Sequence, residues 1–96
     1  MALLTVSGSL FVRSDVALEP DAVATVKVVD HDGEVLAATA VEVESLPVDF
    51  GVAIDADLVT RDLLVWAFLR NGDTGYGTLE LAPADAGEIE LSRIGD

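Results

Sequence analysis

The sequence contains no cysteine and few aromatic residues, prolines or basic residues. The missing cysteine excludes disulfide bonds, thiolate zinc sites and cysteine nucleophiles. No apolar run reaches the roughly 18 residues of a membrane-spanning helix, so we expect no membrane insertion. Five basic residues stand against 18 acidic ones, a net charge of −13. Such a charge repels phosphate backbones and anionic membranes, so we also expect no nucleic-acid partner.

The residues that are present indicate one domain over residues 1–96, since this length suits one domain and not two. Hydrophobic residues make up 51% of the chain, which excludes a disordered protein. Apolar and polar residues alternate with the period of two that is typical of half-buried strands. If Met1 is the native start, the protein is predicted to be cytoplasmic.

The alternation predicts an all-β fold, a two-sheet antiparallel sandwich of about seven strands. A hairpin turn is expected at residues 30–33, where Gly33 permits positive φ. A β-bulge near Ala40 would turn both halves of the third strand toward the core. One helical turn is expected over residues 57–62, with Asp57 as its cap. The strands are predicted at residues 3–13, 22–30, 34–45, 49–55, 63–70, 76–81 and 88–94.

Candidate catalytic groups are few, and the pattern favours a protein that is not an enzyme. His31 is the only histidine, and it lies in the predicted hairpin turn where a solvated side chain is the ordinary case. No Gly-x-Ser-x-Gly motif supplies a nucleophile for it. The glycine-rich residues 71–77 lie between strands without a nearby lysine, so they are interpreted as a turn and not a phosphate loop.

The acidic residues leave two further alternatives open. Asp30-x-Asp32-Gly33 resembles the start of a calcium loop, but the position that should hold a bidentate glutamate is Val41. Two carboxylates on one strand face could also suggest a glycoside hydrolase. A weak calcium-binding module and a carboxylate-based hydrolase therefore remain minor alternatives, while no cofactor and no metal are expected.

The predicted strand at residues 63–70 is apolar on both faces, which makes it the most informative segment. The set Leu63, Val65, Ala67 and Leu69 is assigned to the core, so Trp66 and Phe68 fall on the outer face. Either a loop covers that face, or it binds a peptide or a second copy of the chain. The candidate binding surface comprises Phe11, Leu64, Trp66, Phe68 and Tyr76.

Two blocks of sequence carry a family resemblance. The first is Val6-Ser7-Gly8-Ser9-Leu10-Phe11-Val12-Arg13, followed by residues 18–22 and the strand at 24–30. The second is Pro47-Val48-Asp49-Phe50-Gly51-Val52-Ala53-Ile54, followed by residues 63–69. In these segments the chain resembles the YbaY/YscW-like family of small β-sandwich proteins, which includes type III secretion pilotins.

The resemblance implies a Greek-key-like sandwich and a role in binding or escorting another protein. Pilotins bind a short segment of an outer-membrane secretin subunit, and family members are often envelope lipoproteins. We therefore expect a non-enzymatic domain that binds a protein or peptide partner, with main-chain pairing at a sheet edge as a source of affinity. The alternative is a structural homodimer that self-associates and has no other ligand.

Overall fold

The computed structural model describes residues 3–13, 16–58 and 63–94. These residues form strands and one short 3-10 turn, η1 (Ala56–Leu58), which confirms the all-β prediction. The strands, in chain order, are β1 (Leu3–Phe11), β2 (Val23–Val29), β3 (Val35–Glu42), β4 (Val48–Asp55), β5 (Leu64–Asn71), β6 (Thr74–Gly77), β7 (Ala82–Pro83), β8 (Glu88–Glu90) and β9 (Ser92–Ile94).

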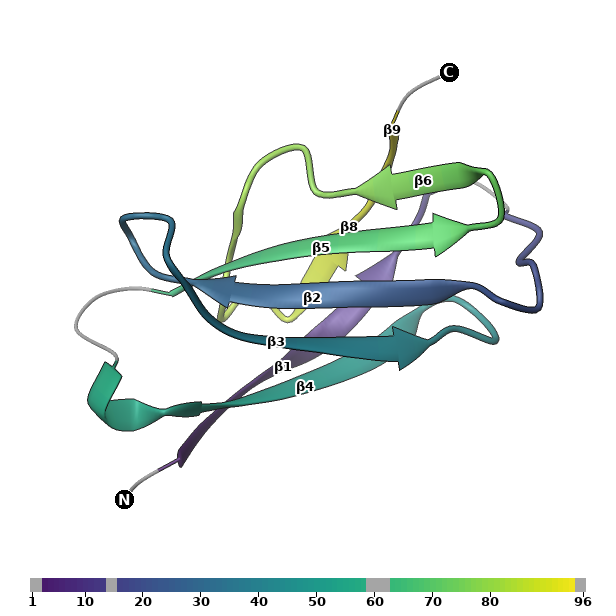
Figure 1. The fold of residues 1–96 in the computed structure, drawn as a ribbon. Coiled ribbons are helices and arrows are strands. Elements are labelled where there is room, and N and C mark those ends of the chain that lie inside the picture. Colours follow the sequence, from purple (N-terminus) through teal and green to yellow (C-terminus); the bar gives the residue numbers. More distant parts are fainter. Residues whose placement is uncertain (1–2, 14–15, 59–62, 95–96) are drawn as a thin grey trace.

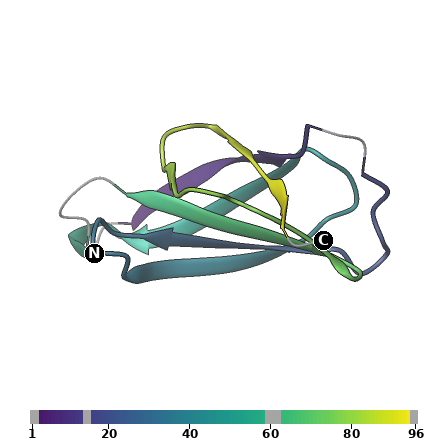
Figure 2. The same cartoon turned by 90° about the horizontal axis from the view of Figure 1, so that it is seen from above.

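The strands are arranged as two sheets that face each other, as predicted (Figure 1). The smaller sheet has the order β4-β1-β8, and the larger has the order β3-β2-β5-β6-β9, with β7 paired to β5. Seen from above, the two sheets are stacked layers (Figure 2). The pairing is antiparallel except between β1 and β8, which run parallel. Because β4 returns to pair with β1, the connections cross between the sheets as in a Greek key.

The core lies between the sheets and is built mainly from valine, alanine and leucine. On β5 the buried set is the predicted one, since Val65, Ala67 and Leu69 are each 0% exposed. On β4 the inward set is likewise the one that the alternation predicts: Phe50, Val52 and Ile54. β2 runs antiparallel to β5 over its whole length, and the two strands form the centre of the larger sheet. The face of β5 that carries Trp66 and Phe68 therefore points away from the core.

The structure divides the last predicted strand, residues 88–94, between the two sheets. β8 pairs with β1 in the smaller sheet, whereas β9 pairs with β6 in the larger one. Leu91 lies at the switch, 1% exposed, and its N–H donates to the carbonyl oxygen of Phe11 at 2.8 Å. With β7 also separate from β6, the described residues form nine strands where about seven were predicted. Alternation does not show which sheet a short strand will join.

The bulge predicted near Ala40 is wrong. The register of β3 against β2 is continuous from Glu42 to Ala37, and it shifts opposite Val28 and Val29. Ala38 and Ala40 consequently lie on the outer face and are exposed, while the alternate residues of β3 face inward. A bulge was inferred because the apolar pattern changes phase, but β3 is an edge strand and tolerates exposed alanines.

The hairpin at residues 30–33 is confirmed, whereas the cap of the short helical turn differs from the prediction. Oδ1 of Asp30 accepts from the N–H groups of Asp32 and Glu34, both at 2.9 Å. Gly33 has the expected positive φ of 87°. At η1, Oδ1 of Asp55 accepts from the N–H of Asp57 at 2.9 Å, so the capping residue is Asp55. The rest of the predicted turn, residues 59–62, lies outside the described residues.

Candidate functional site

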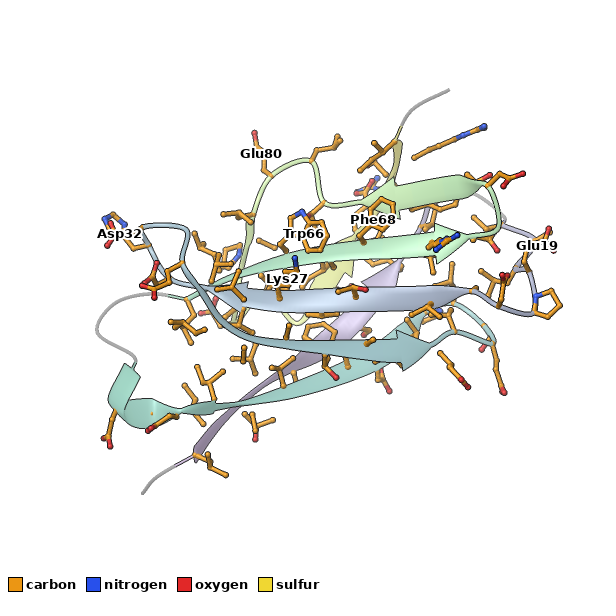
Figure 3. All side chains as sticks on the ribbon, in the orientation of Figure 1. Glu19, Lys27, Asp32, Trp66, Phe68 and Glu80 are labelled. Carbon is orange, nitrogen blue, oxygen red and sulfur yellow. The ribbon has the colours of Figure 1, made fainter. Side chains whose placement is uncertain are left out.

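The outer face of the larger sheet carries a pair of aromatic side chains from β5. The rings of Trp66 and Phe68 are parallel within 7°, and their centroids are 6.2 Å apart. Figure 3 shows the two side chains next to each other above the strand. Both are half-buried, although neither belongs to the core between the sheets. The pair therefore forms an apolar platform that solvent can reach.

Two glycines on β6 leave the room that the Phe68 ring occupies. Gly77 pairs with Phe68 in the register of β5 and β6, and Gly75 pairs with Arg70. A Cβ atom on Gly75 would lie 2.6 Å from Cζ of Phe68. One on Gly77 would lie 2.6 Å from Cδ1 of Ile94 and 3.3 Å from Cδ2 of Phe68. The glycines thus let the ring lean across the neighbouring strand, which widens the apolar surface.

The charges on this face differ from those of the molecule as a whole. The Nζ atom of Lys27, on β2, lies 4.9 Å from the centroid of the Trp66 ring, within reach of a cation–π interaction. Lys27 pairs with Trp66, and Arg70 pairs with Val23, so both basic residues share the outer face. Glu42 lies on the same face through its pairing with Val23. In a chain of net charge −13, the pairing of β2, β3 and β5 thus places Lys27, Arg70 and Glu42 around a central apolar platform.

The five residues of the predicted binding surface do not lie together. Leu64, Trp66 and Phe68 share the outer face of β5, as alternation requires. Tyr76 pairs with Leu69 and is packed against the core, so it lies on the inner face of β6. Phe11 ends β1 in the smaller sheet. The prediction grouped the aromatic residues because the sequence indicates which residues form strands. It does not indicate which strands pair.

Phe11 instead lines an open cavity of about 430 Å³ at one end of the sandwich. The cavity is bounded by the segment after β1 and the loop between β3 and β4, and its lining residues are Phe11, Val12, Val16, Leu18, Glu44, Ser45, Leu46 and Pro47. It is a second surface, separate from the aromatic platform. Only the tertiary structure brings these two loops together.

The remaining motifs of the sequence analysis lie at the β2–β3 hairpin. The side chain of His31 is 58% exposed at the tip of the β2–β3 hairpin. Asp30, the first candidate calcium ligand, uses its carboxylate to accept backbone hydrogen bonds. Residues 3–13, 16–58 and 63–94 contain no group of three or more histidine, aspartate or glutamate side chains placed to hold a metal ion. Within the same residues, no helix is long and apolar enough to cross a membrane.

Comparison with known protein families shows to which family the chain is related. Residues 1–75 match the family described as type III secretion system lipoprotein chaperone (YscW). The protein belongs to the YscW family. The matched part contains β1 to β5, and so includes Lys27, Trp66 and Phe68. The family description concerns lipoproteins and gives no support to the predicted cytoplasmic location.

A solved structure has the same fold as this YscW-family chain. It is an alternative pilotin from the type II secretion system of Vibrio cholerae, with a TM-score of 0.84 and 19% sequence identity. The alignment covers 99% of this chain and 100% of the pilotin, so the likeness extends beyond residue 75 to the last strands. No curated protein sequence matches the chain.

Proposed function

We propose that this protein is a non-enzymatic, chaperone-like domain that binds a segment of a partner protein on the outer face of β5. Membership of a chaperone family over residues 1–75 is the observation that carries this proposal. By the same family relation, the partner is a component of a secretion apparatus, and a short segment of a secretin subunit is the first candidate.

The aromatic platform supports the choice of surface. Interfaces are enriched in tryptophan, tyrosine and arginine near their centres and depleted in acidic residues. The outer face has this composition, with Trp66 and Phe68 at its centre, Arg70 beside them, and Glu42 toward the edge strand β3. An apolar partner segment would cover rings that remain partly exposed outside the core. A second copy of the chain could cover the same rings, so self-association is the competing outcome.

The test uses Trp66 as its own reporter, because it is the only tryptophan in the chain. Overlapping peptides that span a secretin subunit of the source organism are titrated into the purified protein. A binding peptide should shift the Trp66 emission and give a saturable heat in calorimetry. If no peptide of the set does either, the secretin assignment is wrong.

The variant Trp66→Ala then separates binding from folding. If the platform is the site, affinity for the bound peptide should fall by about 2 kcal/mol or more, roughly 30-fold. The free energy of unfolding should fall by much less than the roughly 3–5 kcal/mol that truncation of a core tryptophan typically costs. Leu3→Ala is the matched control, because Leu3 is 69% exposed on the other sheet. Light scattering at several concentrations detects a dimer, and a dimer that Trp66→Ala dissociates would favour self-association over a peptide partner.

A further inference from the structure

We propose that the free edge of β3 is a second docking site, which accepts an extended protein segment with an uncharged centre and Lys or Arg at both ends. The segment would add as a strand to the larger sheet, in the mode known as β-augmentation. β3 is the terminal strand in the order β3-β2-β5-β6-β9, so no strand is hydrogen-bonded along one of its sides, although β4 of the smaller sheet lies close to it. Figure 1 shows β3 at the border of the sheet, next to β2.

The hydrogen-bonding phase of β3 identifies the backbone groups that remain free. The N–H of Val43 donates to the carbonyl oxygen of Ala22 at 3.0 Å. In an antiparallel ladder, hydrogen-bonded and non-hydrogen-bonded pairs alternate. The pairs made with β2 by Val41, Thr39 and Ala37 are therefore the hydrogen-bonded ones.

The alternate residues of β3, namely Ala38, Ala40 and Glu42, direct their N–H and C=O groups away from β2. The described turn and loop hydrogen bonds do not use these groups. They present three donors and three acceptors along one line, with the spacing that an added strand needs. Such a row is the part of a sheet that recruits another chain.

Between its two ends, the edge of β3 lacks the features that usually protect an edge strand. Natural edges carry charges, prolines or bulges that prevent pairing. Residues 36–41 contain neither a charged residue nor a proline. The register shift opposite Val28 and Val29 affects only the start of the strand. The outward side chains of Ala38 and Ala40 are small, so they leave the approach to the backbone open.

The charges at the ends of this edge select the partner. Asp32 and Glu34 lie at its beginning, and Glu42 and Glu44 lie at its end, all four exposed. A second copy added antiparallel would bring Glu34 of one chain near Glu42 of the other, and like charges that face each other across strands are destabilising. A segment with Lys or Arg at both ends would instead place opposite charges there. The edge therefore favours a basic-ended segment over another copy of the chain.

This inference goes beyond the proposed function, because the edge and the aromatic platform are separate surfaces. β2 lies between β3 and β5 in the sheet, so a strand added at the edge would not lie on the Trp66 ring. The two proposals can accordingly fail independently. Trp66→Ala should leave binding at the β3 edge unchanged.

The experiment uses two blocked eight-residue peptides with the same alternating Thr-Val centre, one with lysine at both ends and one with glutamate. Binding to the wild-type protein is measured by calorimetry at low and moderate salt. The lysine-ended peptide should bind at least about tenfold more tightly than the glutamate-ended one, and its affinity should fall as salt is added. Equal affinities, or no binding of either peptide, would overturn the proposal.

Ala40→Pro removes one outward N–H without removing a ladder hydrogen bond to β2. Proline is accepted at such edge positions. The affinity of the lysine-ended peptide should fall at least about fivefold, the range expected for one lost hydrogen bond. The matched control Ala40→Ser keeps the N–H and should stay within about twofold of the wild type. An undiminished affinity in Ala40→Pro would count against pairing at this edge.

Two versions of the lysine-ended peptide, N-methylated on one or the other set of alternate residues, test strand pairing even if Ala40→Pro does not fold. Methylation on the pairing side should abolish binding to the wild-type protein, whereas methylation on the other side should preserve it. If both methylated peptides bind equally, the peptide does not add as a strand. If the protein instead forms a dimer that Ala40→Pro dissociates, the edge belongs to a second copy and the assignment to a basic-ended partner is wrong.

Discussion

Asn71 is a buried polar residue whose side chain links the end of β5 to the connection between β1 and β2. It is 7% exposed, and its Oδ1 atom accepts from the N–H of Glu19 at 2.6 Å. Its Nδ2 group donates to the carbonyl oxygen of Ala17 at 3.0 Å. From the sequence it looked like a turn residue before Gly72. The structure shows that its side chain positions a loop more than 50 residues earlier in the chain, with a sequence separation of 52 to Glu19 and 54 to Ala17.

We expect Asn71→Ala to lower the free energy of unfolding by about 1–3 kcal/mol, because two backbone groups lose their partner. Urea denaturation followed by Trp66 fluorescence measures the change. Asp73→Ala, in the same hairpin turn but exposed, is the control and should stay within about 0.5 kcal/mol of the wild type. If both variants behave alike, the hydrogen bonds of Asn71 do not stabilise the loop.

The β2–β3 hairpin provides a second comparison between neighbouring residues. His31→Ala should change stability by no more than about 0.5 kcal/mol, because the side chain is exposed and its Nε2 atom lies 4.0 Å from the Asp32 carboxylate. Asp30→Ala should cost about 1 kcal/mol, since its carboxylate accepts two backbone hydrogen bonds at the turn. Chemical denaturation of both variants checks the order. A larger loss in His31→Ala than in Asp30→Ala would contradict the assigned hairpin geometry.

At the scale of elements, the contact between β1 and the turn before β8 depends on Gly8. A Cβ atom at this position would lie 2.7 Å from the carbonyl oxygen of Gly87. That oxygen already accepts from the N–H of Ser9 at 2.8 Å. Because Gly8 has no side chain, the backbone of the turn can approach β1 this closely.

Gly8→Ala should therefore destabilise the protein by about 1–3 kcal/mol, because backbone atoms must separate to admit the methyl group. Gly51 lies on the adjacent strand β4 and is the matched control, because a Cβ atom added there would meet no described atom within 4 Å. Gly51→Ala should be neutral or stabilise by up to about 1 kcal/mol through the unfolded chain. Thermal denaturation distinguishes the two variants, and equal effects would show that β1 and the turn can separate at little cost.

At the scale of the whole molecule, the net charge of −13 opposes folding through repulsion between carboxylates. The ion pair between Arg13 and Glu90 is 2.8 Å long, but both side chains are exposed, at 78% and 40%. Exposed pairs of this kind contribute about 0–1 kcal/mol and cannot offset the repulsion. We therefore expect sodium chloride to raise the melting temperature. At 0.1 M, salt shortens the range of the repulsion between charges to roughly 10 Å. A melting temperature that falls steadily between low and moderate salt would show that attractive pairs dominate.

The alternation of residues along the chain was enough to predict the fold class, the positions of most strands and the two faces of β5. This information is local, because successive side chains of a strand point to opposite sides whatever lies next to it. That rule separates Val65, Ala67 and Leu69 from Trp66 and Phe68. The first set is buried, as expected for the longer of the two apolar sets on this strand. The turn at Asp30 could be predicted for the same reason, since its hydrogen bonds join residues close in sequence.

Which strands lie side by side was decided only by the tertiary structure. Tyr76 looked equivalent to Trp66 in the sequence, yet the register of β6 turns it inward against Leu69. Gly75 looked like part of a turn, whereas it makes room for the Phe68 ring. The free amides of Ala38 and Ala40 likewise depend on β3 being an edge strand with a particular hydrogen-bonding phase. Pairing and register arise from contacts between residues far apart in the chain, and a pattern of period two carries no information about them.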